Sequence, residues 1–516
     1  FDKQQKKLIL IRDRMGEKPI YYGFANDSFL FASELKSFYH FPKFEKKISN
    51  NSLYLFFKHC YIPNSYCIYK DIYKLEPSTL LELDLSSNSI SRQTLENKLI
   101  IKNYWKPKFK EEFQNCTNEE YLTNIEEKLS DSVVQQMRSD VPIGSFLSGG
   151  IDSSLVSFLM QKNSINKINT FNVKFDEDNF DESFYARNVA KIIGSNHYEI
   201  KLDYNDALKT IPYLGSIYDE PFSDSSQIPT YLISNKIKKY VSVALSGDGG
   251  DELFGGYNRY TSVENVYNLL KLFPLNSKYL IAKLIKFVSE KNWDNINTIL
   301  ISKLSRKYSY ANFGHKLYRL ADRLKYSSSQ LDIYKSFLSE DISSQKVVNN
   351  STNIDIIQQI IEKNEFPDDD FKNFMMNLDT KMYLPDDILV KVDRASMSNS
   401  LESRAPFLNA DLVELAFNIP SKFKIYKNNK KILLKSILQK YFRKDLFDRP
   451  KAGFAIPLAD WLRGPLKPLL YDSINNLKKS NADVLNFQLI EKKCEEHSSY
   501  LKNYDNFLWS IIVYNN

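Results

Sequence analysis

The chain has 516 residues, and its 70 lysines and arginines outnumber its 63 aspartates and glutamates, which gives a formal net charge of +7. Hydrophobic residues make up 43% and charged residues 26% of the chain, a balance that is typical of globular proteins and excludes disordered and collagen-like chains. The length predicts about two to four domains. Because +7 is weak over this length and no zinc finger or RNP motif occurs, the sequence does not indicate a nucleic-acid partner.

Neither a membrane span nor a secretion signal is predicted. No run of about 18 apolar residues occurs, and the start FDKQQKKLIL lacks an apolar core. The four cysteines, Cys60, Cys67, Cys116 and Cys494, form neither a disulfide framework nor a CxxC metal pair. We therefore expect a cytoplasmic protein whose cysteines are packing or surface residues. The chain starts with Phe1 rather than Met, which indicates an incomplete chain.

Residues 1–100 have the alternation and turn signals of a β-rich domain, in runs such as LILIRD, PIYYGF, SFLFASE and TLLELDL. A helix is predicted between them, within 48–62. Residues 101–118 are charged, contain a proline and lack a clear period, which indicates a linker.

Helices and strands alternate after the linker. Residues 119–140 have apolar positions at helical spacing, and further helices are predicted at 153–162, 184–193 and 224–239. Strands are predicted between and after them, at 141–148, 170–175, 197–202 and 241–246. Strands separated by helices predict a parallel α/β sheet. From about 258 to 440 the pattern is mostly helical, and the lysine runs KIKKY (236–240) and KNNKK (427–431) are expected on solvated faces.

Glycine is scarce but clustered. Of 15 glycines, three fall within 144–150 and five within 247–256, and each cluster follows a predicted strand. Such clusters mark backbone that takes a positive φ or approaches a ligand closely. Two tight turns without a ligand are the alternative, but ordinary turns do not require the serines and aspartates that accompany these glycines.

The first cluster lies in FLSGGIDSSLV (146–156), at a strand-to-helix junction. A helix N-terminus exposes unpaired N–H groups and a positive dipole end, which suit phosphate. Gly149 and Gly150 would let the backbone approach the phosphates, and Asp152 suggests Mg²⁺ because a carboxylate repels phosphate unless a cation separates them. Hydroxyl donors are supplied by Ser148, Ser153 and Ser154. The loop is neither a Walker A motif nor a GxSxG nucleophile elbow.

The second cluster lies in LSGDGGDELFGGYNRY (245–260), after the predicted strand VSVAL. Loops that follow parallel strands converge at the carboxyl edge of a sheet. Asp248, Asp251 and Glu252 place three carboxylates within five residues. We interpret them as a metal and acid–base site facing the phosphate loop; an acidic helix start with capping carboxylates is the alternative.

These motifs resemble a known family. SGGIDSS (148–154) is similar to the pyrophosphate loop of the ATP-pyrophosphatase class, which cleaves ATP between the α and β phosphates. Together with LSGDGGDELFGGY, YLPDDILVKVDRASMSNSLESRAPFLNADLVELA (383–416) and RPKAGFAIP (449–457), it resembles glutamine-dependent asparagine synthetase. RDRMGEKPIYYG, FASELKSF and YWKP resemble the later part of that family's amidotransferase domain and its exit, so the resemblance spans the chain.

The resemblance implies an architecture. Residues 1–100 would be the β-rich C-terminal part of an N-terminal-nucleophile glutamine amidotransferase type-2 domain, and 101–118 the linker. Residues 119–516 would be an α/β parallel-sheet ATP-pyrophosphatase (adenine nucleotide α-hydrolase-like) synthetase domain with a helical C-terminal part. Glutamine hydrolysis in this family requires an N-terminal cysteine. This chain starts with Phe1, so we expect that the chain as given does not hydrolyse glutamine.

Site residues are carried over by position. The resemblance implies ATP binding by Leu147, Ser148, Gly149, Gly150, Asp152, Ser153, Ser154, Val173, Ser246 and Gly247. It implies that Asp152 and Asp251 bind Mg²⁺, that Asp248 acts in forming an acyl-adenylate, and that Lys451 offsets negative charge on the phosphates. Val173 is equally a core strand residue, and the Asp at 248 is shorter than the Glu that many members have.

The implied reaction has two steps. The β-carboxylate of aspartate attacks the α-phosphorus of ATP to give β-aspartyl-AMP and pyrophosphate, and ammonia derived from glutamine then displaces AMP to give asparagine. The implied partners are thus small molecules, namely aspartate, ATP, and glutamine or ammonia, without nucleic acid or membrane. The resemblance also allows a homodimer, although the sequence does not determine the oligomeric state.

Three alternatives remain open. A related amidotransferase would use a sugar acid or another carboxylate, as in surface polysaccharide biosynthesis. A non-catalytic binding protein would keep the fold without turnover, and a tRNA-modifying enzyme lacks support because no RNA-binding module is present. Five charged residues of the helical segment are interpreted either as ion pairs that brace the site or as substrate contacts: Lys391, Asp393, Arg394, Glu402 and Arg404.

Overall fold

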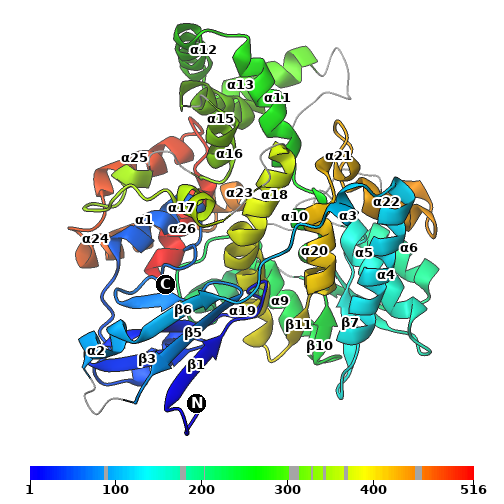
Figure 1. Cartoon of the computed structure of the whole chain (residues 1–516). Coiled ribbons are helices and arrows are strands. Elements are labelled where there is room, and N and C mark those ends of the chain that lie inside the picture. Colours follow the sequence, from blue (N-terminus) through cyan, green and yellow to red (C-terminus); the bar gives the residue numbers. More distant parts are fainter. Residues whose placement is uncertain are drawn as a thin grey trace.

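The computed structural model describes residues 1–86, 91–174, 182–202, 204–301, 313–326, 329–340, 344–364, 366, 370–447 and 456–516. Figure 1 shows an N-terminal part rich in strands, a second sheet flanked by helices, and a helical remainder. The second sheet is parallel throughout, which confirms the α/β class predicted from the alternation of helices and strands.

The N-terminal part contains two antiparallel sheets of three strands. One has the order β1-β5-β6, with strands Lys7–Ile11, Thr79–Asp84 and Leu99–Asn103. The other has the order β3-β2-β4, with strands Ser28–Ala32, Tyr21–Ala25 and Ile72–Lys74. Side chains of β5 alternate between buried and half-buried, as one covered face requires. Leu81 and Leu83 of β5 join Tyr22 and Phe24 of β2 in one core cluster.

Strand β6 includes the first three residues of the segment predicted as a linker. It pairs with β5 from Leu99 to Asn103, and the short helix α3 (Glu111–Gln114) follows before α4 begins at Asn118. Most side chains of LIIKN are exposed, and its residues do not alternate between apolar and polar, so this strand has little signal in the sequence.

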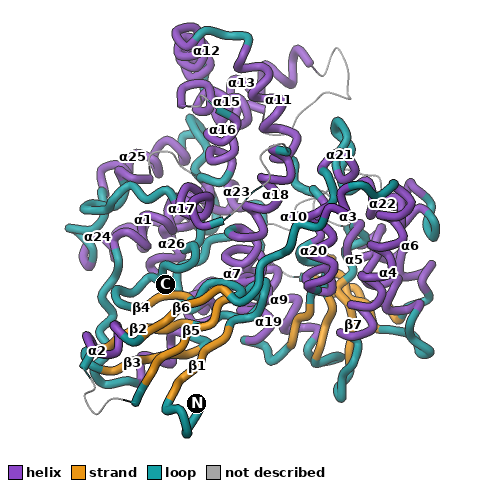
Figure 2. The backbone as a smooth tube through the Cα atoms, in the orientation of Figure 1, coloured by secondary structure: helices purple, strands orange, loops and turns teal. Residues whose placement is uncertain are grey.

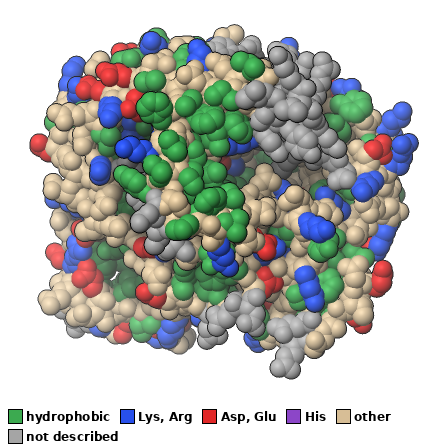
Figure 3. All heavy atoms as spheres, turned by 90° about the horizontal axis from the view of Figure 1, so that it is seen from above, with side chains coloured by type: hydrophobic (Ala, Val, Ile, Leu, Met, Phe, Trp, Pro, Cys, Tyr) green, Lys and Arg blue, Asp and Glu red, His purple; other side chains and the backbone are tan. Residues whose placement is uncertain are grey.

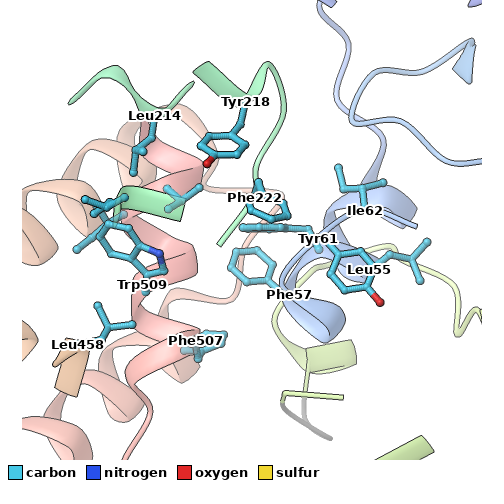
Figure 4. Packing of buried hydrophobic residues seen from close by; sticks show 14 of the residues in the cluster. Leu55, Phe57, Tyr61, Ile62, Leu214, Tyr218, Phe222, Leu458, Phe507 and Trp509 are labelled. Carbon is cyan, nitrogen blue, oxygen red and sulfur yellow. The ribbon is translucent and has the colours of Figure 1, made fainter. Parts of the chain in front are cut away.

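Helix α1 (Asn50–His59) joins the N-terminal part to the rest of the chain. Its Phe57 lies 5.7 Å from Phe507 of α26 (Asp505–Asn515), measured between ring centroids. Figure 4 shows Phe57 and Tyr61 pointing toward Phe222, with Trp509 of α26 nearby. These residues belong to one hydrophobic core cluster, so the two parts share a core.

The parallel sheet has the order β11-β10-β7-β8-β9. Its strands are β7 (Ile143–Phe146), β8 (Asn169–Lys174), β9 (Asn196–Lys201), β10 (Val243–Leu245) and β11 (Glu402–Arg404). The chain moves from β7 to β8 and β9 on one side and then returns to place β10 on the other side of β7. The strand order therefore reverses between β7 and β10, where open α/β sheets bind ligands.

Helices cover both faces of this sheet (Figure 2). Val243 and Leu245 of β10 lie in a core cluster with α4 (Asn118–Gln136) and α5 (Ile151–Lys162), whereas Ala244 lies in the cluster that contains α9 (Gln227–Ile237). Helix α4 begins with a capping box between Thr117 and Glu120. The sheet is thus buried on both sides, as its continuous apolar runs require.

The remaining part is helical, as predicted. Its longer helices are α6 (Ser183–Ile193), α11 (Arg259–Lys271), α12 (Leu275–Phe287), α15 (Phe313–Tyr326), α18 (Phe371–Lys381), α19 (Leu389–Met397), α20 (Ala410–Asn418), α24 (Lys467–Ser480) and α25 (Phe487–Ser498). Its shorter helices are α7 (Tyr204–Thr210), α8 (Leu214–Tyr218), α10 (Gly250–Phe254), α13 (Glu290–Ile296), α16 (Gln330–Phe337), α17 (Ile356–Lys363), α21 (Ser421–Lys424), α22 (Ile432–Gln439) and α23 (Leu458–Arg463). Helix α2 (Arg92–Asn97) lies in the N-terminal part. Among the described residues, no helix combines the length and the hydropathy that crossing a bilayer requires.

Candidate active site

The two glycine-rich loops lie side by side at the point where the strand order reverses. The first loop follows β7 and leads into α5, and the second follows β10 and leads into α10. Strands β7 and β10 are parallel neighbours, with Leu245 opposite Ser145, so both loops leave the same edge of the sheet. The convergence predicted from the sequence is therefore confirmed.

Glycine lets the two loops touch. A Cβ on Gly247 would stand 2.8 Å from the Cβ of Asp152, and a Cβ on Gly250 would stand 2.6 Å from its Oδ1. Gly149 has a φ of +73°, and a Cβ there would stand 2.7 Å from the backbone nitrogen of Ala186 in α6. No side chain fits at distances below 3.0 Å, so the second loop rests directly on the first turn of α5.

Serine hydroxyls fix the first loop over the start of α5. The hydroxyls of Ser148 and Ser153 lie 3.0 Å apart, the backbone N–H of Ser148 donates to Ser153 Oγ over 3.2 Å, and the N–H of Gly150 donates to Ser148 Oγ over 3.2 Å. Gly150 is the N-cap, and no described side chain caps this helix. The first turn of α5 therefore offers backbone N–H groups that suit an anion.

The other predicted ATP-binding residues support the loops from within. Leu147 and Ser154 are buried on either side of the loop, and Ser246 is buried with its N–H donating to the carbonyl of Arg404 over 2.8 Å. Val173 is buried on β8, the strand next to β7. All four residues therefore lie within the sheet, in the loops that leave it or in the first turn of α5. Whether each of these residues contacts ATP stays a prediction.

Asp152 and Asp251 meet at one cation, the ammonium of Lys431. Lys431 Nζ lies 2.5 Å from Asp251 Oδ1 and also forms an ion pair with Asp152 Oδ2. The Lys431 side chain is only 6% exposed and projects from the N-cap of α22. The expectation that KNNKK lies on a solvated face is therefore wrong for its last residue. The apolar helix ILLKSIL that starts directly after it was the available signal of burial.

This donor set fits Mg²⁺. Proteins bind Mg²⁺ through one or two carboxylates, with phosphates and water completing its coordination. Asp152 and Asp251 are two carboxylates from two loops that already share one cation. No group of three or more metal-ligating side chains occurs in the part of the chain that the structure describes. The pair therefore fits an ion that takes its remaining ligands from a phosphate substrate and water.

Asp248 belongs to the second loop, and its carboxyl is influenced by the acidic pair and by a buried lysine. Burial raises the pKa of the Asp248 carboxyl, and the charges of Asp251 and Asp152 raise it further, whereas the Ser246 hydroxyl and Lys391 oppose the shift. Lys391 of α19 forms an ion pair of 2.6 Å with Asp224. The charge of Lys391 therefore favours the ionised form of Asp248, whereas the charges of Asp152 and Asp251 disfavour it. Lys451, the other predicted catalytic residue, lies outside the described residues.

Glu252 is buried in α10, directly after Asp251. The hydroxyl of Tyr257 donates to Glu252 Oε1 over 2.5 Å, and the guanidinium of Arg259 lies 4.1 Å from the centre of the Tyr257 ring. Burial first, and then the charge of Asp251, raise the pKa of Glu252 to about 7. Asp251 and Glu252 lie in the first turn of α10, as the alternative of an acidic helix start expects, but no described side chain caps this helix. The role of these carboxylates as a metal and acid–base site stays a prediction.

The charged residues of 391–404 form ion pairs. Lys18 of the N-terminal part lies 2.6 Å from Asp393, and Arg394 donates to the carbonyl of Ser33 over 2.9 Å. Two further pairs are Lys391 with Asp224 and Arg404 with Glu402, the latter on β11 rather than on a helix. The contacts of Asp393 and Arg394 join the N-terminal part to the sheet domain, and the pairs as a whole favour the ion-pair interpretation.

The sequence matches two family models. Residues 124–515 match the model described as asparagine synthase, and residues 1–95 match a glutamine amidotransferase domain. The chain belongs to the asparagine synthase family.

Several curated members of the asparagine synthase family align with the chain. Asparagine synthetase [glutamine-hydrolyzing] 1 of Bacillus subtilis is 26% identical over all of this chain and 75% of its own length. Putative asparagine synthetase [glutamine-hydrolyzing] 2 of Methanocaldococcus jannaschii is 33% identical over 77% of this chain and 71% of its own length. Amidase chyE of Penicillium rubens is 22% identical over 94% of this chain and 72% of its own length.

A solved structure gives a weaker match. The NMN synthetase from Francisella tularensis is 17% identical and covers 28% of this chain and 60% of its own, with a TM-score of 0.19. That score is too low to establish a shared arrangement. The family models and the curated relatives therefore carry the assignment.

Proposed function

We propose that the protein is an asparagine synthase of the glutamine-hydrolysing type, which uses ATP to activate the β-carboxylate of aspartate and then forms the amide with ammonia. One observation carries the proposal: the two loops at the strand reversal place Asp152 and Asp251 on a single cation beside the uncapped start of α5. A triphosphate needs both features, N–H donors for its oxygens and a cation between them and the carboxylates.

The phosphate chain lies over the first turn of α5. The uncapped backbone N–H groups of this first turn would donate to it, together with the hydroxyls of Ser148 and Ser153, which now bond to each other. Lys431 supplies a buried positive charge at the same point. Mg²⁺ held by Asp152 and Asp251 would supply charge neutralisation of the phosphates.

The chemistry divides into two displacements. In the first, a carboxylate oxygen of aspartate forms a bond to the α-phosphorus, and pyrophosphate leaves with the electron pair of the broken P–O bond. In the second, ammonia forms a bond to the acyl carbon, AMP leaves with the pair of the broken C–O bond, and the nitrogen loses a proton. Loop N–H groups, Lys431 and, as we propose from its motif, Lys451 stabilise the charge that develops on phosphate oxygens. Asp248 lies beside this centre and acts in forming the adenylate.

The acceptor is the least constrained part of the proposal. Relatives at 22% and 23% identity over most of this chain are named as amidases, so the fold serves more than one amide chemistry. A sugar acid or another carboxylate stays the second candidate acceptor, as the resemblance allows. Because the reaction consumes ATP, we place it in the cytoplasm.

The test supplies the protein with ATP, Mg²⁺, aspartate and ammonium chloride, and measures AMP, pyrophosphate and asparagine by mass spectrometry. Ammonium makes the result independent of glutamine hydrolysis. Equal amounts of AMP and asparagine support the proposal. AMP formation with a uronic acid but not with aspartate would replace the acceptor, and the absence of AMP with every acceptor from a folded sample would overturn the proposal.

Asp152→Asn tests the site itself. We expect it to abolish AMP formation, because one of the two carboxylates that we propose to hold Mg²⁺ loses its charge. Asp131→Asn on the exposed face of α4 is the matched control and should keep full turnover. Full turnover in Asp152→Asn would contradict the site assignment.

A further inference from the structure

The segment of the consecutive helices α11 and α12, which we call the hairpin, protrudes from the molecule, at the top in Figure 1; α11 packs against α16 and α12 against α15. Its surface presents a set of large apolar side chains, which we name the hairpin patch: Leu269, Leu272, Tyr279, Leu280, Leu284 and Phe287. Leu272 is 75% exposed and Phe287 is 87% exposed. Figure 3, which looks onto this end, shows hydrophobic side chains gathered in a contiguous group with lysines and arginines among them.

Helix α12 packs one apolar face against the protein, and the patch includes its other, exposed face. In α12, Ala282 is buried, and Ile281 and Ile285 pack against the main core. Leu280, Leu284 and Phe287 recur at intervals of four and three residues, so they lie along one face of the helix. This second apolar face is exposed throughout. A helix that is apolar on two sides and covered on one has surface available for a partner.

From residue 265 onward the charged side chains of the hairpin have one sign; Glu264, earlier in α11, forms an ion pair with Lys372. From 265 to 289 the sequence contains four lysines, Lys271, Lys278, Lys283 and Lys286, and neither aspartate nor glutamate. Lys286 forms an ion pair with Asp322 of α15. The ion pairs found among the described residues give the other three lysines no carboxylate partner. These lysines, which we name the cationic rim, therefore give a positive charge to the segment that carries the apolar patch.

We propose that the hairpin patch docks on a membrane surface that contains anionic lipids. Exposed Leu, Tyr and Phe side chains combined with lysines are the composition by which helices lie in the plane of a bilayer interface. The lysines would contact lipid phosphates, and the apolar face of α12 would enter the boundary between headgroups and acyl chains. The charge argues against a second copy of the chain, because a two-fold contact would bring two cationic rims together. The proposal does not depend on the proposed function, since no residue of the patch belongs to the two loops.

The test is sedimentation of the full chain with vesicles. One set is phosphatidylcholine alone, and the other is phosphatidylcholine with phosphatidylglycerol in a ratio of about 3:1. We expect binding to the anionic vesicles at low salt, at least tenfold weaker binding to the neutral vesicles, and a steep loss of binding as salt is raised. Equal binding to both, or binding to neither at low salt, would overturn the proposal.

Two triple variants separate the apolar and the charged contributions. Leu280→Ser, Leu284→Ser and Phe287→Ser together remove the exposed face of α12, and Lys271→Glu, Lys278→Glu and Lys283→Glu together reverse the charge of the rim. We expect each triple variant to bind anionic vesicles at least tenfold more weakly. All six residues are at the surface or near it, so the fold should persist, which circular dichroism and AMP formation would show.

Matched controls are available elsewhere on the surface. Phe1, Ile165 and Tyr213 are comparably exposed apolar residues, and their replacement by Ser should leave vesicle binding unchanged. Lys3, Lys43 and Lys239 are exposed, and their replacement by Glu lowers the net charge as much as the rim variant does. Equal loss of binding in the controls would show general attraction of a basic protein and overturn the assignment to the patch.

Two results would show that the patch binds a partner other than a membrane. If light scattering shows a dimer that the apolar triple variant dissociates, while vesicles do not bind, the patch is a contact between copies of the chain. If polyglutamate binds with the same dependence on the rim lysines and vesicles do not, the partner is an acidic protein. Either result overturns the lipid proposal.

Discussion

Gly250 lies directly against the Asp152 carboxylate: a Cβ on Gly250 would stand 2.6 Å from Asp152 Oδ1. Gly250 does not take a positive φ, so the lack of space rather than the backbone conformation requires glycine here. The second loop can therefore approach the start of α5 only if this position has no side chain. This close approach lets Asp152 and Asp251 form ion pairs with the same lysine, Lys431.

Gly250→Ala should separate the loops. The added methyl group pushes the second loop away from α5, and overpacking of this kind costs about 1–3 kcal/mol of stability. We expect AMP formation to fall at least tenfold, measured with ATP, Mg²⁺, aspartate and ammonium. Gly194→Ala is the control, because Gly194 has a φ of +76° but no atom within 4 Å of its Cβ position. It should lose about 1 kcal/mol of stability and keep its turnover. Unchanged turnover in Gly250→Ala would mean that the loops work independently.

Lys431→Met should disable the site in a second way. The substitution leaves Asp152 and Asp251 close together without their shared cation, and removal of one partner of a buried ion pair costs about 3–5 kcal/mol. We expect a lower Tm and loss of AMP formation. Mg²⁺ without nucleotide should raise the Tm of the variant more than that of the wild type, because a divalent ion replaces the missing charge.

Lys430→Met provides the comparison for this prediction. Lys430 is the neighbouring residue, but its ammonium hydrogen-bonds to the side-chain oxygen of Asn258 at the surface rather than to the acidic pair. It should keep the wild-type Tm within about 2 °C and respond to Mg²⁺ as the wild type does. A similar loss of turnover in both variants would show that the lysine run as a whole, and not Lys431, carries the effect.

The sequence predicts well the helices, strands and loops that are determined by short stretches of neighbouring residues. The alternation of helix and strand from 119 to 246 follows from apolar periodicity, and the loops after β7 and β10 follow from glycine clusters in a chain that has only 15 glycines. Strand β11 was missed because it has only three residues, Glu402, Ser403 and Arg404, whose polar character gives no strand signal. Strand β11 forms because these residues pair with β10, which lies far away in the sequence.

The position of Lys431 could not be predicted from the sequence, because it depends on contacts between distant parts of the chain. It lies 279 positions from Asp152 in the sequence, in a run of lysines and asparagines that reads as a solvated surface. Its burial results from the packing of α22 against α4 and α5, which no local pattern encodes. The motif RPKAGFAIP identified a lysine by resemblance, whereas the described structure brings a different lysine to the acidic pair. The domain boundaries and the role of Lys451 stay predictions.

Asp386 should make stability depend on pH. Burial raises the pKa of its carboxyl to about 7, whereas an unfolded chain titrates an aspartate near pH 4. Between about pH 4 and 7 the folded protein therefore binds a proton that the unfolded chain has lost, so stability decreases as pH rises through this range and levels off above it. Asp386→Asn stays neutral at every pH and should raise the Tm at pH 8 by roughly 3 °C while leaving it unchanged near pH 4.5.

Asp472→Asn is the control for this pH dependence, because Asp472 is exposed on α24. Its Tm should follow the wild type at each pH, measured by calorimetry at pH 4.5, 6 and 8. An Asp386→Asn variant that loses Tm at pH 8 would show that the hydrogen bonds from Asn64 to the carboxylate, one of 2.9 Å from its backbone N–H, outweigh the cost of burying the charge.

Phe57→Ala should test whether the amidotransferase-like part and the synthetase part unfold as one unit. Phe57 is 1% exposed and packs 5.7 Å from Phe507 and 6.2 Å from Tyr514, which belong to the C-terminal helix α26. Truncation of a buried phenylalanine costs about 3–5 kcal/mol. Because the two parts share one core cluster, we expect a single calorimetric transition that shifts as a whole to lower temperature. Phe31→Ala, at a position that is 49% exposed on β3, should leave the transition in place. Two transitions, of which Phe57→Ala lowers only one, would show instead that each part has an independently stable core.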